Sequence, residues 1–128
     1  MKKVEETIQA LQKKPSQEGL AIALTAIRRA VKAGEEVIVP VEPPLPGQQP
    51  KLRVLEQDGG RWLYVYTSFD QQAKSPDPLQ STFMGKLEQV LAMGSEPGLS
   101  GVILNPYGYT MRLDQALIRI IFGTSQTS

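Results

Sequence analysis

The side chains that could carry acid–base chemistry in this sequence are carboxylates and lysines, because it contains no histidine and no cysteine. The candidate carboxylates are Asp58, Asp70, Asp77 and Asp114. Three of these aspartates stand where helix N-caps are expected, and Asp58 stands in an expected hairpin turn. Nothing in their spacing brings two of them to the separation of roughly 5–10 Å that paired-carboxylate hydrolysis uses. We therefore expect that this protein is not an enzyme.

The composition argues against several other classes of function. Without cysteine and histidine a metal site would need oxygen ligands alone, and no acidic loop has the calcium spacing, so we expect neither metal nor cofactor. A net charge of +1 provides no general attraction to nucleic acid. No apolar run approaches the roughly 18 residues of a membrane span. Acidic residues rather than an apolar segment follow Lys2 and Lys3, so we expect a cytoplasmic protein without membrane contact.

A second group of side chains is suited to binding. The apolar run 101–104 ends at Asn105-Pro106, a typical turn start, and Gly108 allows the chain to reverse. Asparagine before proline is expected to be extended, with its side chain bonded to nearby backbone. The candidate interaction surface at this turn comprises Asn105, Pro106, Tyr107, Tyr109, Thr67 and Ser68. The turn is either a recognition tip with tyrosine anchors or a corner that holds two strands and orients the last helix.

Three aromatic residues extend this candidate surface. Trp62, Tyr64 and Tyr66 alternate along one expected strand and therefore share a face, whereas Leu63 and Val65 face the other side, the expected core. Such a row could stack on bases, but no row of basic residues accompanies it, which favours a covered sheet face. A pocket between this face and the Asn105 turn would suit a small-molecule sensor.

The strongest helix pattern, residues 17–33, ends in a basic cluster of Arg28, Arg29 and Lys32. This cluster is either a patch for an acidic partner or a solvated helix end, where cations suit the helix dipole.

Hydrophobic periodicity and turn signals predict the remaining elements. The expected helices span residues 3–14, 17–33, 68–74, 78–93 and 115–122, and the expected strands span 37–41, 51–57, 61–67, 101–104 and 109–113. This order predicts an α+β fold, alternatively α/β. We expect a single layered domain over residues 1–128, with helices packed on one mixed, mostly antiparallel sheet of about five strands. Its core would span about 17–122, after an N-terminal helix within 1–15 and before a flexible tail at 123–128.

Three motifs and their order are similar to those of a known family. They are Val39-Pro40-Val41, Tyr66-Thr67-Ser68-Phe69 and Gly101-Val102-Ile103-Leu104-Asn105-Pro106-Tyr107-Gly108, followed by Leu113 and the last helix. In this respect the chain resembles, from about Gln17 to Phe122, the N-terminal domain of the SseB family, which is named for an enhanced serine sensitivity protein and also associated with type III secretion. The resemblance implies a cytoplasmic bacterial domain with no established catalytic residues.

Taken together, these features predict a non-enzymatic protein-interaction or adaptor domain. The expected partner is another protein, and self-association into a homo-oligomer is one form that such binding could take. The alternative is a regulatory domain that senses a small molecule.

Overall fold

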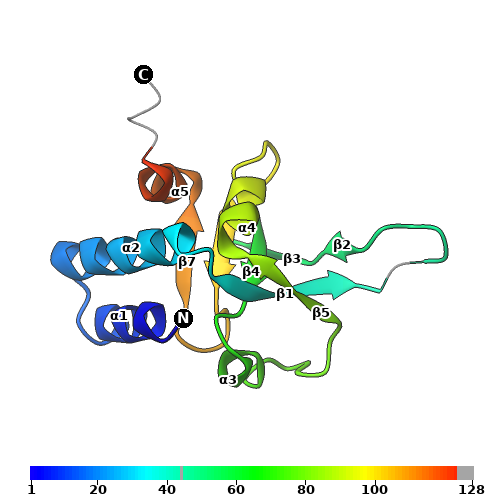
Figure 1. Ribbon diagram of the computed structural model, residues 1–128, viewed down its shortest axis with the longest axis horizontal. Coiled ribbons are helices and arrows are strands. Elements are labelled where there is room, and N and C mark those ends of the chain that lie inside the picture. Colours follow the sequence, from blue (N-terminus) through cyan, green and yellow to red (C-terminus); the bar gives the residue numbers. More distant parts are fainter. Residues whose placement is uncertain (44, 124–128) are drawn as a thin grey trace.

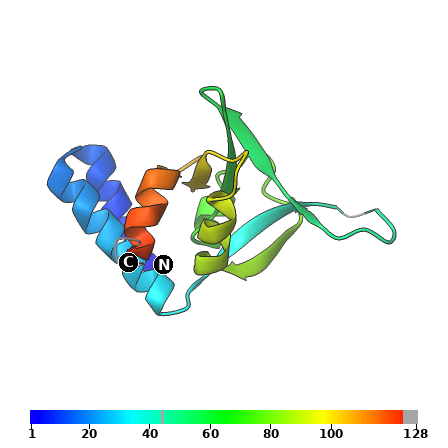
Figure 2. The same cartoon turned by 90° about the horizontal axis from the view of Figure 1, so that it is seen from above.

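The computed structural model describes residues 1–43 and 45–123, and within them the chain forms five helices and seven strands. In chain order these are α1 (Lys2–Lys13), α2 (Gln17–Lys32), β1 (Glu36–Glu42), β2 (Lys51–Leu52), β3 (Val54–Gln57), β4 (Gly60–Val65), α3 (Phe69–Gln72), β5 (Thr82–Lys86), α4 (Leu87–Gly94), β6 (Gly101–Leu104), β7 (Met111–Asp114) and α5 (Gln115–Phe122). Helices α1, α2 and α5 group at one end of the molecule, and α4 lies against the strands (Figures 1 and 2). The predicted α+β class is confirmed.

The strands form two sheets, ordered β2-β1-β5 and β3-β4-β6-β7, in place of the one sheet of about five strands that was expected. A bridge between Ile38 and Tyr66 joins them. Among the described strands β4 and β6 pair in parallel, and the other pairs are antiparallel. Pro40 sits where the neighbour of β1 changes from Tyr66 to β2, so its missing N–H interrupts no ladder.

Alternation along β4 divides its side chains between two clusters, as predicted. Leu63 and Val65 belong to the large core that the helices cover. Trp62, Tyr64 and Tyr66 lie on the opposite face, in a smaller buried cluster with Ile38 and Ile103. The period of two therefore gave the correct core side.

The hairpin between β3 and β4 also forms as predicted. Gln57 pairs with Gly60, which leaves Asp58 and Gly59 as the two turn residues. Their φ angles are 50° and 77°, as in a type I′ turn, whose twist matches that of the flanking strands.

The predicted helix over 78–93 is wrong in its first half. Residues Thr82–Lys86 form β5, which pairs with β1, and only Leu87–Gly94 are helical. Thr82 and Phe83 favour strands, and Gly85 is a poor helix former, so the backbone bonds offered by β1 override the apolar spacing. Leu79, which the predicted helix would include in its first turn, is 92% exposed in a loop.

The last helix is built from local signals that the sequence contains. The Asp114 side chain accepts a hydrogen bond from the Leu117 amide (2.8 Å) and so caps α5. Leu113 and Ile118 are both fully buried beside this cap. Gly123 ends the helix with a φ of 68°. The remainder of the predicted tail, residues 124–128, lies outside the described residues.

Candidate functional site

Asn105 is the centre of a buried hydrogen-bond network. Its Oδ1 accepts from the Thr67 amide (2.8 Å), and its Nδ2 donates to Thr67 Oγ1 (2.9 Å) and to the Tyr109 carbonyl (3.2 Å). The Asn105 amide donates to the Val65 carbonyl (2.8 Å), and its own carbonyl accepts from Thr110 Oγ1 (2.7 Å). Asn105 is fully buried. Its polar groups are therefore all engaged within the fold and point to no ligand.

The backbone of Asn105 differs from the expected extended conformation. Its φ of 51° lies in the left-handed region, where asparagine is tolerated better than most residues. This φ allows the chain to leave β6 and return as β7 within a few residues, while the side chain turns back to Thr67. The prediction that this side chain would bond to nearby backbone is confirmed.

Two helical segments hold the same turn from outside. From α1, Glu5 accepts a hydrogen bond from Thr67 Oγ1, and Gln12 donates to the Gly108 carbonyl (3.3 Å). From α3, Gln71 Oε1 accepts from the Tyr109 amide (2.9 Å). Ser68 caps α3, with its Oγ accepting from the Gln71 amide (3.3 Å). The Gln71 side chain bonds to the turn and does not reach back to Ser68 as it would in a capping box.

Gly108 permits the close approach of α3. A Cβ added at Gly108 would lie 2.1 Å from Gln71 Oε1 and 3.0 Å from Lys74 Cδ. The Lys74 ammonium lies over the Tyr109 ring, 5.3 Å from its centroid. A side chain at Gly108 would displace the Gln71 side chain and break its hydrogen bond to the Tyr109 amide.

Little of the predicted tip is open to a partner. Thr67 and Asn105 are buried, and Ser68, Pro106 and Tyr109 are half-buried. Tyr107 is 43% exposed and is the large side chain of the turn that reaches solvent. The structure brings the predicted residues together, but most of their polar groups form hydrogen bonds within the turn and its neighbours.

The aromatic face is a packed layer. Trp62, Tyr64 and Tyr66 are all buried, and the Tyr64 and Tyr66 rings meet edge to face at 6.1 Å. Gln80 lies within hydrogen-bond distance of both tyrosine hydroxyls, at 3.4 Å each. Burial, followed by the negative charge that Tyr66 would carry, raises the pKa of Tyr64 to about 12. A stacked base or a small ligand would have to displace these contacts.

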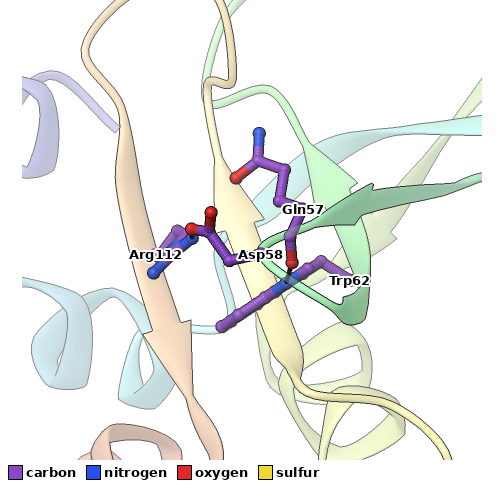
Figure 3. A network of polar contacts seen from close by, with 4 residues as sticks. All are labelled: Gln57, Asp58, Trp62 and Arg112. Atoms are coloured by element: carbon purple, nitrogen blue, oxygen red, sulfur yellow. Dashed lines mark hydrogen bonds and ion pairs between the residues drawn. The ribbon is translucent and has the colours of Figure 1, made fainter.

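Arg112 of β7 covers the outer end of this layer. Its guanidinium lies 4.9 Å from the centre of the Trp62 ring and 2.6 Å from the Asp58 carboxylate (Figure 3). The Trp62 indole N–H donates to the Gln57 carbonyl (3.3 Å). The network therefore ties the β3–β4 turn to β7 and protects the indole face from solvent.

Two of the four candidate carboxylates have structural partners, and the expected helix cap at Asp77 is wrong because no helix begins there. Asp58 pairs with Arg112, and Asp114 caps α5. Asp70 lies in the first turn of α3, and Asp77 in the loop that precedes β5. Within residues 1–43 and 45–123, no three Asp or Glu side chains gather where they could hold a metal ion.

The open surface of the helical end was not predicted. A groove of about 380 Å³ lies between α1 and α2, and its lining residues are Lys3, Thr7, Glu18, Ala21, Ile22, Thr25, Ala26 and Arg29. It continues toward the α1–α2 turn past Ala10 and Lys14. Ile22 is 50% exposed on this surface. The available signal was that Ile22 lies off the apolar stripe of α2, which contains Leu20, Leu24 and Ile27.

The basic cluster at the end of α2 is divided between two roles. Arg28 turns to α5, where its guanidinium donates to the carbonyls of Ile120 and Ile121, the last turn of that helix. Arg29 is exposed and lines the α1–α2 groove. The solvated-end interpretation therefore fails for Arg28, whereas Arg29 and Lys32 are exposed and fit either interpretation.

The fold and these surfaces define a class of protein. It is an α+β domain in which the predicted polar site, the Asn105 turn, bonds mainly to other parts of the same fold. The chain belongs to the SseB protein N-terminal domain family, because the family model matches residues 4–119. The match extends the resemblance to include α1. Searches of curated proteins and of solved structures found no match. In the described part of the chain, no helix is both long and apolar enough to cross a membrane.

Proposed function

We propose that this chain is a non-enzymatic protein-interaction domain that binds an amphipathic helix of a partner protein in the groove between α1 and α2. The observation that carries the proposal is the half-exposed Ile22 in a groove whose floor also contains Ala21 and Ala26. An aliphatic side chain at such a position contributes more to stability when a partner covers it than when water does.

The shape of the groove favours a helix as the bound element. Two neighbouring helices, α1 and α2, form its walls, and its lining on α2 runs from Glu18 to Arg29, a length of about 18 Å. Small residues such as Ala21 and Thr25 allow a third helix to approach closely, with its side-chain ridges in the groove.

The charges around the groove favour an acidic partner. Lys3 and Arg29 line it together, and Lys14 lies near the α1–α2 turn, where Glu18 provides the opposing carboxylate. The basic residues outnumber the acidic one, so a helix with Asp or Glu beside its apolar stripe is complementary. The expected binding helix therefore carries an aliphatic anchor for the Ile22 region and acidic residues toward Lys3 and Arg29.

Affinity capture from a bacterial lysate, with matched variants, tests this proposal. The Ile22→Glu variant places a charge in the groove, and Leu45→Glu makes the same change at an exposed leucine of the β1–β2 loop. We expect at least one protein that binds the wild type and Leu45→Glu but not Ile22→Glu. Thermal unfolding must be unchanged in both variants.

A captured protein is then narrowed to the segment that binds. We expect a helical peptide with acidic residues, and its affinity should fall with added salt and in Lys3→Glu and Arg29→Glu variants. Full retention of every captured protein by Ile22→Glu, or a bound segment without helix, contradicts the proposal.

A further inference from the structure

β5 leaves one edge of the smaller sheet open. Its bonds to β1 involve alternate residues: Leu87 donates to the Glu35 carbonyl, the Val41 amide donates to the Ser81 carbonyl, and Phe83 and Gly85 pair with β1 between them. The backbone N–H and C=O groups of Thr82 and Met84 and the N–H of Lys86 therefore face away from β1, whereas the Lys86 carbonyl accepts the first hydrogen bond of α4. Among the described strands β5 is the last on this side of the sheet, and Figure 2 shows it at the lower margin of the ribbon.

The open edge is also apolar. Phe83 is 47% exposed and Met84 49%, and Leu79 stands almost fully exposed in the loop before them. Edge strands in soluble proteins usually carry charged residues or prolines that discourage pairing. One outer strand of the other sheet, β3, has exposed Glu56 and Gln57 at its turn end. Alternating free backbone groups accept an extended chain, whereas a helix cannot satisfy them.

We propose that β5 pairs with β5 of a second copy of this chain, antiparallel about a two-fold axis at Met84. This pairing would join the two three-stranded sheets of the copies into one continuous sheet. The occupant is a second copy because the strand complements itself over its whole length. In this register Thr82 faces Lys86 of the second copy and Met84 faces its own equivalent. Because the Lys86 carbonyl is used by α4, the two copies exchange about four backbone hydrogen bonds.

The side chains fit the same register. Phe83 faces Gly85 of the second copy. Because each Phe83 ring already lies over Gly85 of its own chain, the two rings become diagonal neighbours across the pairing. Lys86 faces threonine, so the pairing places no two lysines opposite each other. A shift of the axis to Phe83 would leave Lys86 opposite Gln80, outside the strand, and would shorten the ladder. The Met84-centred register is therefore the longest symmetric pairing that β5 can make.

Light scattering and sedimentation over a range of protein concentration test the pairing. We expect the full chain to shift from its mass of 14.1 kDa to twice that value as concentration rises. A chain that stays monomeric up to about 1 mM overturns the proposal, since such a concentration detects even weak association.

The variant Met84→Pro removes an N–H that faces outward and leaves the bonds to β1 in place. We expect Met84→Pro to be monomeric, whereas Met84→Ala, which keeps the N–H, still dimerises. A dimer that survives Met84→Pro uses another surface and overturns the proposal.

Two substitutions at Thr82 test the register even if Met84→Pro fails to fold. Thr82→Glu places a carboxylate opposite Lys86 of the second copy, and Thr82→Lys places an ammonium there. We expect Thr82→Glu to strengthen dimerisation and Thr82→Lys to weaken it, each about two- to fivefold and less so in high salt. Equal effects of the two substitutions overturn the Met84-centred pairing.

The pairing is independent of the groove between α1 and α2, so the two proposals can fail separately. Ile22→Glu is expected to abolish partner capture and leave the dimer unchanged, whereas Met84→Pro is expected to abolish the dimer and leave partner capture unchanged. Loss of the dimer in Ile22→Glu would place the self-association in the groove and overturn the β5 pairing.

Discussion

The Asn105 corner and the outer face of α2 differ in what their side chains are bonded to. At the corner, Asn105 and Thr67 satisfy each other, and residues of α1 and α3 satisfy the turn around them. On the outer face, Ile22 is half-exposed beside small residues, and the exposed Arg29 lines the same groove. The corner is rich in polar and aromatic residue types that often bind ligands. The outer face of α2 presents mainly small and aliphatic residues, which are not typical of a ligand site.

This difference shows why residue type alone is a weak guide to function. A polar side chain whose donors and acceptors are all paired inside the fold contributes to stability and has no bond left for a ligand. An exposed aliphatic side chain in a groove gains from any partner that removes it from water. The expected effects of substitutions therefore separate the two regions: stability should change at the corner, and binding should change at the outer face.

The largest effect on stability is expected from Asn105→Ala. The substitution leaves the Thr67 amide and the Tyr109 carbonyl without their partner and places alanine at a φ of 51°. We expect the free energy of unfolding, measured in urea, to fall by about 3–4 kcal/mol.

Asn105→Gly separates the two causes of that loss. Glycine adopts this φ without strain but makes no side-chain bond, so the loss should be roughly 1 kcal/mol smaller than for alanine. If both variants unfold like the wild type, the corner does not hold the fold together, and the comparison between the two regions fails.

The next largest loss of stability is expected from Gly108→Ala. Its Cβ would collide with Gln71 Oε1 and break the bond between Gln71 and the Tyr109 amide. We expect a loss of about 2–3 kcal/mol, from the combined clash and unpaired amide. Gly59→Ala is the matched control: this glycine has a φ of 77° but nothing within 4 Å of an added Cβ, so strain alone should cost about 1 kcal/mol.

In a double-mutant cycle, Gln71→Ala should remove most of the penalty of Gly108→Ala, because the atom in the way is then absent. If the stability losses of the two substitutions are strictly additive, the contact with Gln71 does not explain the need for glycine at position 108.

The structural elements that could be predicted from the sequence depend on residues close together in the chain. The Asp58-Gly59 turn and the caps Ser68 and Asp114 each need a few neighbours, and all of them form. The strand state of β5 could not be predicted, because it depends on bonds to β1 about 40 residues earlier. The sequence left two interpretations of the Asn105 turn, a recognition tip or a structural corner. The structure distinguishes them through contacts of Gln71 and Glu5, which are far from the turn in sequence.

A smaller effect, visible only at high pH, is expected from the aromatic layer. Burial raises the pKa of Tyr64 from its ordinary value of 10.0 to about 12. The folded state then holds the phenol proton more tightly than the unfolded state, so the stabilisation is complete below pH 10 and is lost as pH rises toward 12.

Tyr64→Phe removes the titrating group, so stability measured from about pH 9 to about pH 12 should fall less steeply than in the wild type. Equal slopes for the two proteins would show that the Tyr64 hydroxyl is hydrated in the folded state, and that the aromatic layer is more open than its contacts indicate.

The smallest effect on stability is expected at Tyr107, and it provides the sharpest test of the comparison. Tyr107 is exposed at the tip of the turn, so Tyr107→Ala should change the free energy of unfolding by no more than about 0.5 kcal/mol. If the corner is purely structural, Tyr107→Ala also retains every partner that Ile22→Glu loses in affinity capture. A partner lost in Tyr107→Ala and retained by Ile22→Glu would reverse the assignment, because the turn would then be a recognition tip mounted on its own buried network.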